Sequence, residues 1–227
     1  MKAATVTSEA AAPGAGPIGE LQDVTGQGVI HRSPRDNARW APAPEPGALV
    51  STADYGCTLG PAISRLGQAG FLTAEHCVKG GAMQYARVNA AAVNPLALGP
   101  AVEGNAVTDS AVIWTETAAD DVRVAGTWPV RGLLSVDQVR ALPAGATVCF
   151  NGAVSGVRCG GKLTGGLTFT TDAAAQQGDS GSESFVVDER GDAWIVGIVS
   201  NSPAGKSLMR SVADILDHLH AEIVTAS

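Results

Sequence analysis

The fold of this chain can be inferred from GDSG at residues 178–181, read together with TAEHC at residues 73–77 and TDSAV at residues 108–112. In chain order, these segments supply a histidine, an aspartate and a serine, the side chains that nucleophilic acyl transfer needs. A serine hydroxyl is a weak nucleophile near neutral pH, so an imidazole must accept its proton. A buried carboxylate must hold that imidazole in the correct tautomer. The candidate residues are His76, Asp109 and Ser180.

Each segment also has a simpler structural interpretation. A histidine beside a cysteine, as His76 is, can be a packed core residue, and Asp109 can cap a turn. The sequence Gly-Asp-Ser-Gly is favourable in turns for its own reasons. The catalytic interpretation therefore depends on the ordered set of three. Glycines around Ser180 would allow backbone N–H groups to converge on a developing oxyanion.

The composition excludes several classes of protein. The chain has 227 residues and is 45% hydrophobic, which is enough for one large or two small domains with a substantial core. Charged residues make up only 16%, so disorder over the whole length is not expected. The formal net charge of −7, without a basic run, argues against nucleic-acid binding. No apolar stretch approaches the ~18 residues that a membrane-spanning helix needs.

The pattern of short apolar runs between turn residues, with 28 glycines, favours an all-β barrel or sandwich. Apolar residues on one helical face predict a helix over residues 211–223, with Ser211 as its N-cap. Residues 1–50 hold six of the twelve prolines and are predicted to be an extension or the remnant of a pro-segment. The predicted strands cover residues 55–59, 70–74, 82–89, 110–115, 121–125, 146–150, 154–158, 162–170, 184–188 and 193–200.

The four cysteines allow three disulfide pairings. Sequence order suggests Cys57–Cys77 and Cys149–Cys159, with four buried thiols or a zinc site as alternatives. Zinc is disfavoured because no C-x-x-C spacing occurs. Disulfides require an oxidising compartment, yet residues 1–20 lack the apolar segment of a signal peptide. We therefore expect a secreted or cell-envelope protein whose export signal is not in this sequence.

With three motifs in this order and two cysteine loops around them, the chain resembles the chymotrypsin-fold serine proteases, in particular their bacterial, streptogrisin-like branch. The resemblance covers residues 51–222. It implies an all-β fold of two six-stranded Greek-key β-barrels with a C-terminal helix. The first barrel would span residues 51–125, and the second barrel with the helix would span residues 126–227. Residues 1–50 would precede both.

Carried over to this sequence, the resemblance implies that His76 is the general base and later the acid, that Asp109 orients it, and that Ser180 is the nucleophile. The backbone N–H groups of Gly178 and Ser180 would form the oxyanion hole. The substrate would be a peptide or protein, and neither a cofactor nor a metal ion is expected. The sequence sets no expectation for the oligomeric state. The implied substrate-binding residues are Ala174, Ala175, Ser200, Asn201 and Ser202.

The sequence departs from this family in three respects. Ser182 stands where a second glycine is common after the nucleophile, and no cysteine pair is present for the third disulfide of many relatives. Phe150 replaces the arginine that usually pairs with the buried Asp179. A buried carboxylate without a partner is costly. We therefore expect Asp179 to pair with Arg158, with Arg140, or with the α-amino group of a processed N-terminus, which would make the chain a zymogen.

The activity expected from the resemblance is hydrolysis of peptide bonds after small or medium-sized apolar residues. Residues 173–177 contain no acid that would favour a basic substrate residue, although Asp172 is close. Residues 199–202 contain no basic group that would favour glutamate. The alternatives are a catalytically silent binding module with this fold, an uncleaved zymogen and, more weakly, an esterase that uses the same triad.

Overall fold

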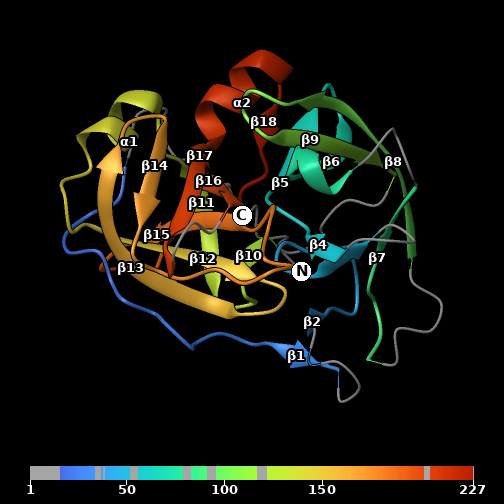
Figure 1. The fold of residues 1–227 in the computed structure, drawn as a ribbon, viewed down its shortest axis with the longest axis horizontal. Coiled ribbons are helices and arrows are strands. Elements are labelled where there is room, and N and C mark those ends of the chain that lie inside the picture. Colours follow the sequence, from blue (N-terminus) through green and yellow to red (C-terminus); the bar gives the residue numbers. More distant parts are fainter. Residues whose placement is uncertain are drawn as a thin grey trace, which may run out of the picture.

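The computed structural model describes residues 16–33, 37, 39–51, 56–78, 83–90, 96–116, 122–201 and 205–226. Most of its regular structure is β, in two eight-stranded sheets and one two-stranded sheet (Figure 1). The two large sheets curl into barrel-like bodies that lie side by side, and a helix follows the last long strand. This arrangement confirms the fold class predicted from the sequence.

The first sheet is built mainly from the N-terminal half of the chain. Its strand order is β18-β5-β6-β9-β8-β7-β3-β4, and all of its neighbouring strands are antiparallel. These strands are β3 (Leu49–Ser51), β4 (Gly56–Thr58), β5 (Ala62–Arg65), β6 (Gln68–Thr73), β7 (Met83–Ala86), β8 (Leu96–Asn105), β9 (Ser110–Thr115) and β18 (Glu222–Ile223).

The second sheet has the order β10-β11-β16-β15-β12-β13-β14-β17. Strand β16 also pairs with β17, so six of these strands close into a barrel. Strand β11 is parallel to β16, and the other neighbours are antiparallel. The strands are β10 (Arg123–Val124), β11 (Trp128–Leu133), β12 (Thr147–Gly152), β13 (Gly156–Gly165), β14 (Thr168–Thr171), β15 (Glu183–Val187), β16 (Ala193–Asn201) and β17 (Ser207–Ser211).

Three short helical segments and a small hairpin complete the fold. Strands β1 (His31–Arg32) and β2 (Arg39–Trp40) pair with each other. The helical segments are η1 (Glu75–Cys77), α1 (Val136–Ala141) and α2 (Val212–Leu219). Helix α1 begins with a capping box, in which Ser135 and Gln138 each bond the other's backbone N–H.

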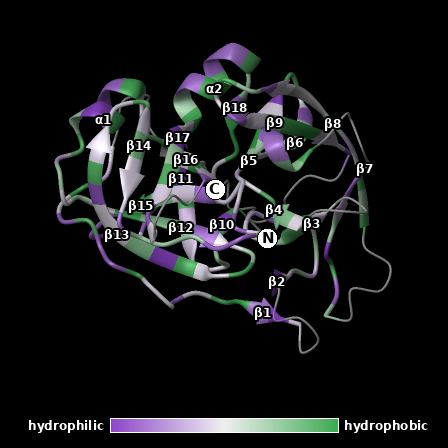
Figure 2. Ribbon diagram, viewed as in Figure 1, coloured by the Kyte–Doolittle hydropathy of each residue, from purple (hydrophilic) through white to green (hydrophobic). Residues whose placement is uncertain are grey.

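One hydrophobic core continues from the first sheet into the second. Leu72 and Val112 of the first sheet belong to the same cluster as Phe185 and Ile195 of the second, and all four are at most 1% exposed. Helix α2 carries both hydrophobic and hydrophilic residues, as Figure 2 shows, and buries residues such as Ile215. Burial of this shared apolar surface holds the two barrels together.

Two predicted elements are wrong in detail. The predicted strand over residues 162–170 runs across a turn, because β13 ends at Gly165 and β14 begins at Thr168. The predicted helix over residues 211–223 ends at Leu219, since His220 adopts a left-handed conformation with φ 49° and residues 222–223 form β18. Ser211 is the N-cap residue, but its side chain makes no capping hydrogen bond.

The predicted division into residues 1–50, 51–125 and 126–227 stays a prediction. In strand pairing, β3 and β18 belong to the first sheet and β10 belongs to the second. Among the described residues, no helix has both the length and the apolar character required to cross a membrane.

Candidate active site

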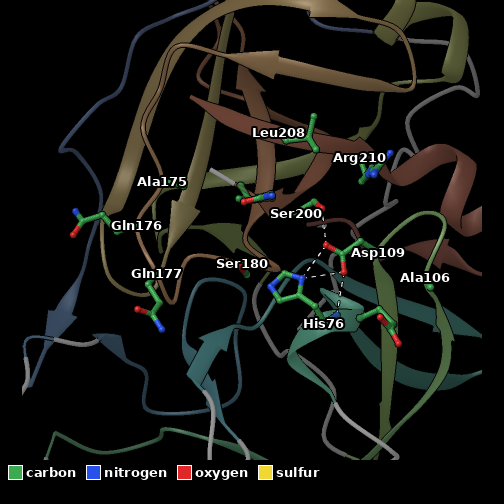
Figure 3. Close-up of a pocket in the computed structure, with 13 residues that line it drawn as sticks. His76, Ala106, Asp109, Ala175, Gln176, Gln177, Ser180, Ser200, Leu208 and Arg210 are labelled. Carbon is green, nitrogen blue, oxygen red and sulfur yellow. Dashed lines mark hydrogen bonds and ion pairs between the residues drawn. The ribbon is translucent and has the colours of Figure 1, made fainter. Parts of the chain in front are cut away.

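His76 lies on the 3₁₀ turn η1, directly after the buried end of β6. The next residue, Cys77, forms a disulfide with Cys57 of β4, which ties the turn to the first sheet. The side chain of His76 is 48% exposed, so its ring faces the cleft while one edge is held by Asp109 (Figure 3). The second disulfide joins Cys149 and Cys159, and both predicted pairings are therefore confirmed.

Asp109 joins the two barrels at this site. It ends the turn between β8 and β9 with a φ of 48°, in the left-handed region that aspartate tolerates better than most residues. His76 Nδ1 lies 2.9 Å from Oδ2, and the backbone N–H of His76 donates to Oδ1 at 3.0 Å. From β16 of the other barrel, Ser200 Oγ donates to Oδ2 at 2.5 Å. The carboxylate that holds one edge of the imidazole is thus itself held by the second barrel.

His76 and Asp109 each stabilise the charged form of the other. The hydrogen bond to Asp109 raises the pKa of His76 above its ordinary value, against the opposing effect of burial. Burial alone would raise the pKa of Asp109, but hydrogen bonds from His76 and Ser200 outweigh it and lower that pKa. Asp109 is therefore ionised at neutral pH and favours an imidazolium beside it.

Ser180 lies in a loop that is organised by the fully buried Asp179. The carboxylate of Asp179 accepts four hydrogen bonds, at 2.5–3.0 Å. Its donors are the backbone N–H groups of Val154, Ser155 and Gln176 and the hydroxyl of Ser155. Backbone and hydroxyl donors therefore satisfy this carboxylate directly.

Two of the three predicted partners of Asp179, Arg158 and Arg140, are wrong. No hydrogen bond or ion pair joins Asp179 to Arg158 or Arg140 in the part of the chain that the structure describes. Arg158 is exposed. Arg140 Nη1 instead lies 3.6 Å from Oδ1 of Asp137, which is on the same helix. The third, the α-amino group of an N-terminus processed within residues 1–50, stays a prediction.

The first barrel holds the loop around Ser180 through Thr58. The Thr58 hydroxyl donates to the carbonyl of Gly178 at 2.8 Å, and its backbone N–H donates to the carbonyl of Ser180 at 2.8 Å. Gly181 is required here for two reasons. Its φ is 86°, and a Cβ would lie 2.5 Å from Thr73 Oγ1 and 2.6 Å from the carbonyl oxygen of Thr58.

Two backbone N–H groups of this loop have no partner among the described residues. Within the described ranges, no acceptor is recorded for the N–H of Gly178 or of Ser180. Both residues nevertheless have their carbonyl groups anchored by Thr58. Anchored carbonyls and unclaimed N–H groups are the arrangement that an oxyanion hole needs.

Ser180 and His76 line one cleft, but no hydrogen bond between their side chains is recorded among the described residues. Such bonds are often long in enzymes without substrate and tighten when it binds. In the view of Figure 3, Ser180 lies to the left of the imidazole, and Asp109 and Ser200 lie to its right.

The cleft has a volume of about 720 Å³. Of the predicted substrate-binding residues, Ala175, Ser200 and Asn201 line it, whereas Ala174 is exposed and is not part of its lining. Ser202 lies outside the described residues. Gln176, Gln177 and Val199, from the segments expected at the base and wall of the pocket, also line it. The remaining lining residues, which were not expected there, are Glu75, Ala106, Leu208 and Arg210.

Arg210 and Leu208 come from β17, a strand that the sequence analysis did not predict. Arg210 donates to Thr168 Oγ1 at 2.5 Å, and its buried Nε has no recorded partner in the described structure. It is the one lysine or arginine among the described residues that line the cleft. Residues 207–211, Ser-Leu-Met-Arg-Ser, do not alternate polar and apolar side chains, so hydrophobic periodicity gave no signal for this strand.

One group of possible metal ligands lies beside the cleft, namely Cys57, His76 and Cys77. Both sulfurs are joined in the disulfide, so neither is a thiolate. A thiolate is the form of cysteine that binds metal. This group therefore offers only His76 as a ligand and does not fit a metal ion.

Comparison with known proteins agrees with this fold. No family model and no curated protein sequence matches the chain. Among solved structures, Thermobifida fusca Protease A has a TM-score of 0.61 and 22% identity, over 80% of this chain and 98% of its own. A glutamic acid-specific serine protease that uses a histidine triad in substrate binding has a TM-score of 0.65 and 17% identity, over 80% and 100%. Nocardiopsis protease has a TM-score of 0.56 and 21% sequence identity, and the match covers 79% of this chain and 97% of that protein. The chain therefore has the fold of the bacterial chymotrypsin-like serine proteases, as its motifs predict.

Proposed function

We propose that this chain is a serine endopeptidase that hydrolyses peptide bonds through an acyl-enzyme. His76, Asp109 and Ser180 would be its catalytic residues. The observation that carries the proposal is the Asp109–His76 pair, which opens onto the same cleft as Ser180. The unclaimed N–H groups of Gly178 and Ser180 support it further.

In the acylation step, Ser180 Oγ attacks the carbonyl carbon of the scissile bond while His76 Nε2 takes the hydroxyl proton. The carbonyl electron pair moves onto oxygen, where the N–H groups of Gly178 and Ser180 stabilise the negative charge. When the carbonyl re-forms, the C–N bond breaks and His76 gives its proton to the leaving amine. The remaining part of the substrate is then an ester of Ser180.

In the deacylation step, water attacks this ester and gives a proton to His76. The ester C–O bond breaks, and the proton passes from His76 to Ser180 Oγ. Asp109 stays ionised throughout and stabilises the imidazolium that forms twice in each cycle. The lowered pKa of Asp109 and the raised pKa of His76 support this division of roles.

The decisive experiment is labelling of the full chain with a fluorophosphonate probe, with Ser180→Ala as the control. We expect the unsubstituted protein to be labelled and to hydrolyse a peptide amide, and the variant to do neither. Absence of labelling in folded, oxidised protein would instead indicate a binding module or an uncleaved zymogen. Mass spectrometry of the N-terminus would distinguish these two. Cleavage of simple esters without cleavage of amides would favour the esterase.

For substrate preference, we propose a small or medium-sized apolar residue before the scissile bond. The apolar side chains of Ala175 and Val199 in the cleft lining support this choice. A series of peptide amides with Ala, Val, Leu, Phe, Glu or Arg at that position tests it. We expect the highest kcat/KM for the first three. A maximum for Glu would contradict the preference and point to recognition by Arg210.

For localisation, we propose a secreted or cell-envelope protein. The two disulfides support a working environment that is oxidising. Fractionation of the native host, followed by thiol labelling without reductant, would test this. A reduced protein in the cytosol would contradict it.

A further inference from the structure

Residues ahead of the first barrel dock on the second barrel close to the nucleophile loop. We call the described residues 31–33, 37 and 39–46 the N-terminal arm. It contains the β1–β2 hairpin, in which the rings of His31 and Trp40 stack at 4.9 Å, and it lies at the lower edge of the molecule in Figure 1. The sequence predicts this region only as an extension or the remnant of a pro-segment, without specific contacts to either barrel.

The arm contacts the turn between β12 and β13. The backbone N–H of Arg39 donates to the carbonyl of Ala153 at 2.9 Å, and Arg32 Nη1 donates to the carbonyl of Val154 at 2.7 Å. The N–H groups of Val154 and the following residue are the ones that hold Asp179. The arm and Asp179 therefore bind opposite polar groups of one turn.

A second connection runs through buried side chains. Arg39 is 1% exposed, and its Nη1 donates to Asn151 Oδ1 at 2.5 Å. Asn151 Nδ2 in turn donates to Glu183 Oε1 at 2.9 Å. Glu183 is also 1% exposed and lies three residues after Ser180, at the start of β15. A chain of hydrogen bonds thus leads from the arm to the end of the nucleophile loop.

The two arginines of the arm also provide positive charge for two buried carboxylates. Burial raises the pKa of Glu183 to about 7, while the hydrogen bond from Asn151 and the charge of Arg39 act in the opposite direction. Burial likewise lowers the pKa of Arg32, whereas attraction to Asp179 acts against that shift. A buried carboxylate without such compensation is strongly disfavoured.

We propose that the N-terminal arm braces residues 176–182, the loop around Ser180 that we call the oxyanion loop. In this proposal, Arg39 is a positioning residue that acts through Asn151 and Glu183. The brace keeps the N–H groups of Gly178 and Ser180 aimed at the reacting carbonyl oxygen. This proposal rests on the proposed function, because it concerns the same site. It also accounts for Phe150, since the positive charge comes from the arm and not from that position.

The test compares Arg39→Met with Arg190→Met in the full chain. Arg190 lies on an exposed turn after β15, so its variant controls for the loss of one positive charge. Rates are expressed per active site, titrated with the fluorophosphonate probe. For Arg39→Met we expect kcat to fall about 10- to 100-fold with KM within about twofold, because a small misplacement of catalytic groups lowers the rate by that order. The control is expected to keep the kcat of the unsubstituted protein.

A second readout reports on the oxyanion hole itself. A peptide aldehyde adds Ser180 Oγ to its carbonyl carbon, and the resulting hemiacetal oxygen occupies the oxyanion hole. Its affinity is expected to fall in Arg39→Met by the same factor as kcat. Arg39→Lys keeps one charge but cannot serve both Asn151 and Glu45 as the guanidinium does, so it is expected to recover only part of the loss.

Several results would overturn the proposal. A folded Arg39→Met protein with unchanged kcat and aldehyde affinity would do so, as would an effect on KM alone. If Arg39→Met does not fold, Arg39→Lys carries the test, and unchanged kcat in that variant would overturn it. If the unsubstituted protein is inactive, the proposed function fails separately. Faster hydrogen exchange over residues 176–182 in the Arg39 variant than in the control would then support the brace, and equal exchange would overturn it.

Discussion

The histidine side and the serine side of the cleft are built differently. His76 is half-exposed, and the one carboxylate of Asp109 orients it. Ser180, by contrast, follows the fully buried Asp179, which accepts four hydrogen bonds, and its loop is held again by Thr58. His76 is thus left accessible, as the proposed proton acceptor must be, whereas the loop that contains Ser180 is fixed by burial.

This difference predicts that substitutions on the two sides have different effects on the catalytic rate and on stability. On the histidine side, loss of a hydrogen bond should reduce the rate and change its pH dependence while the fold persists. On the serine side, loss of a hydrogen bond leaves buried donors without an acceptor, so stability and rate should fall together. Four substitutions test this contrast.

The largest effect is expected for Asp109→Asn. Without the carboxylate, His76 loses the tautomer and the imidazolium stabilisation that the mechanism needs, and kcat is expected to fall about 10⁴-fold. In the unsubstituted protein, kcat/KM should rise with a midpoint above the ordinary histidine pKa of about 6.5, because His76 must lose its proton to act as a base. Asp137→Asn, on the exposed face of α1, is the matched control. A variant that keeps its rate would contradict the histidine-side assignment.

The next largest effect is expected for Asp179→Asn. Each carboxylate oxygen accepts two donors, so an amide NH₂ in place of either oxygen would face two N–H or O–H groups. We expect the free energy of unfolding to fall by about 3 kcal/mol and kcat to fall about 10²-fold. Urea unfolding and steady-state kinetics measure the two quantities. A loss of rate with unchanged stability would remove the contrast between the two sides.

Glu183→Gln tests the buried carboxyl of the serine side by pH. The folded-state pKa of about 7 is above the ordinary value of 4.5, so the folded protein holds this proton more tightly than the unfolded chain does. The stability from this group is complete below about pH 4.5 and is lost as pH rises through about 7. Between pH 4 and pH 8, the unsubstituted protein should lose roughly 3 kcal/mol relative to the variant. Parallel stability curves for the two proteins would contradict this.

The smallest effect is expected for Ser200→Ala. This change removes one of the donors to Asp109 but leaves the His76 contact in place. A hydrogen bond to a charged group contributes roughly 1.5–3 kcal/mol, and we expect kcat to fall about tenfold. The thermal midpoint should change less than it does in Asp179→Asn. A rate equal to that of Asp109→Asn would show that Ser200, and not His76, is the main support of the carboxylate.

The residues proposed as catalytic could be named from the sequence because each lies in a short motif, and the structure places all three at one cleft. The order of the four cysteines also predicted two local disulfides, and the structure contains both, Cys57–Cys77 and Cys149–Cys159. Asp109 and Ser200 meet across the barrels, however, and no local pattern encodes that contact. The four donors around Asp179 are largely backbone groups, which the sequence does not distinguish from any others.

Several strands were missed for physical reasons. In β17, the polar Ser207 and Ser211 are buried together with Met209, whereas Leu208 and Arg210 are partly exposed at the cleft, so burial does not follow the polarity of the side chains. In β8, the pair Gly99-Pro100 indicates a turn by composition, but the structure places it beside a register shift with β7. Hydrophobic periodicity predicts strands that face a core, and these strands do not follow that rule.

The N-terminal arm shows the same limit for charged residues. Arginine is almost never fully buried without a partner, so Arg39 in a proline-rich stretch indicates a solvated position. Its burial depends on Asn151, Glu45 and Glu183, which are distant from one another along the chain or on different strands. Only the folded arrangement brings these partners together.

Each end of the described chain is bound to the barrel that the neighbouring part of the sequence does not build. Residues 22–29 bond to the second barrel before the chain enters the first at β3, and β18 returns from the second barrel to pair with β5 of the first. Unfolding of either barrel therefore removes hydrogen-bond partners from the other. Denaturation of this molecule should accordingly be a single cooperative transition, and separately expressed halves should not remain folded.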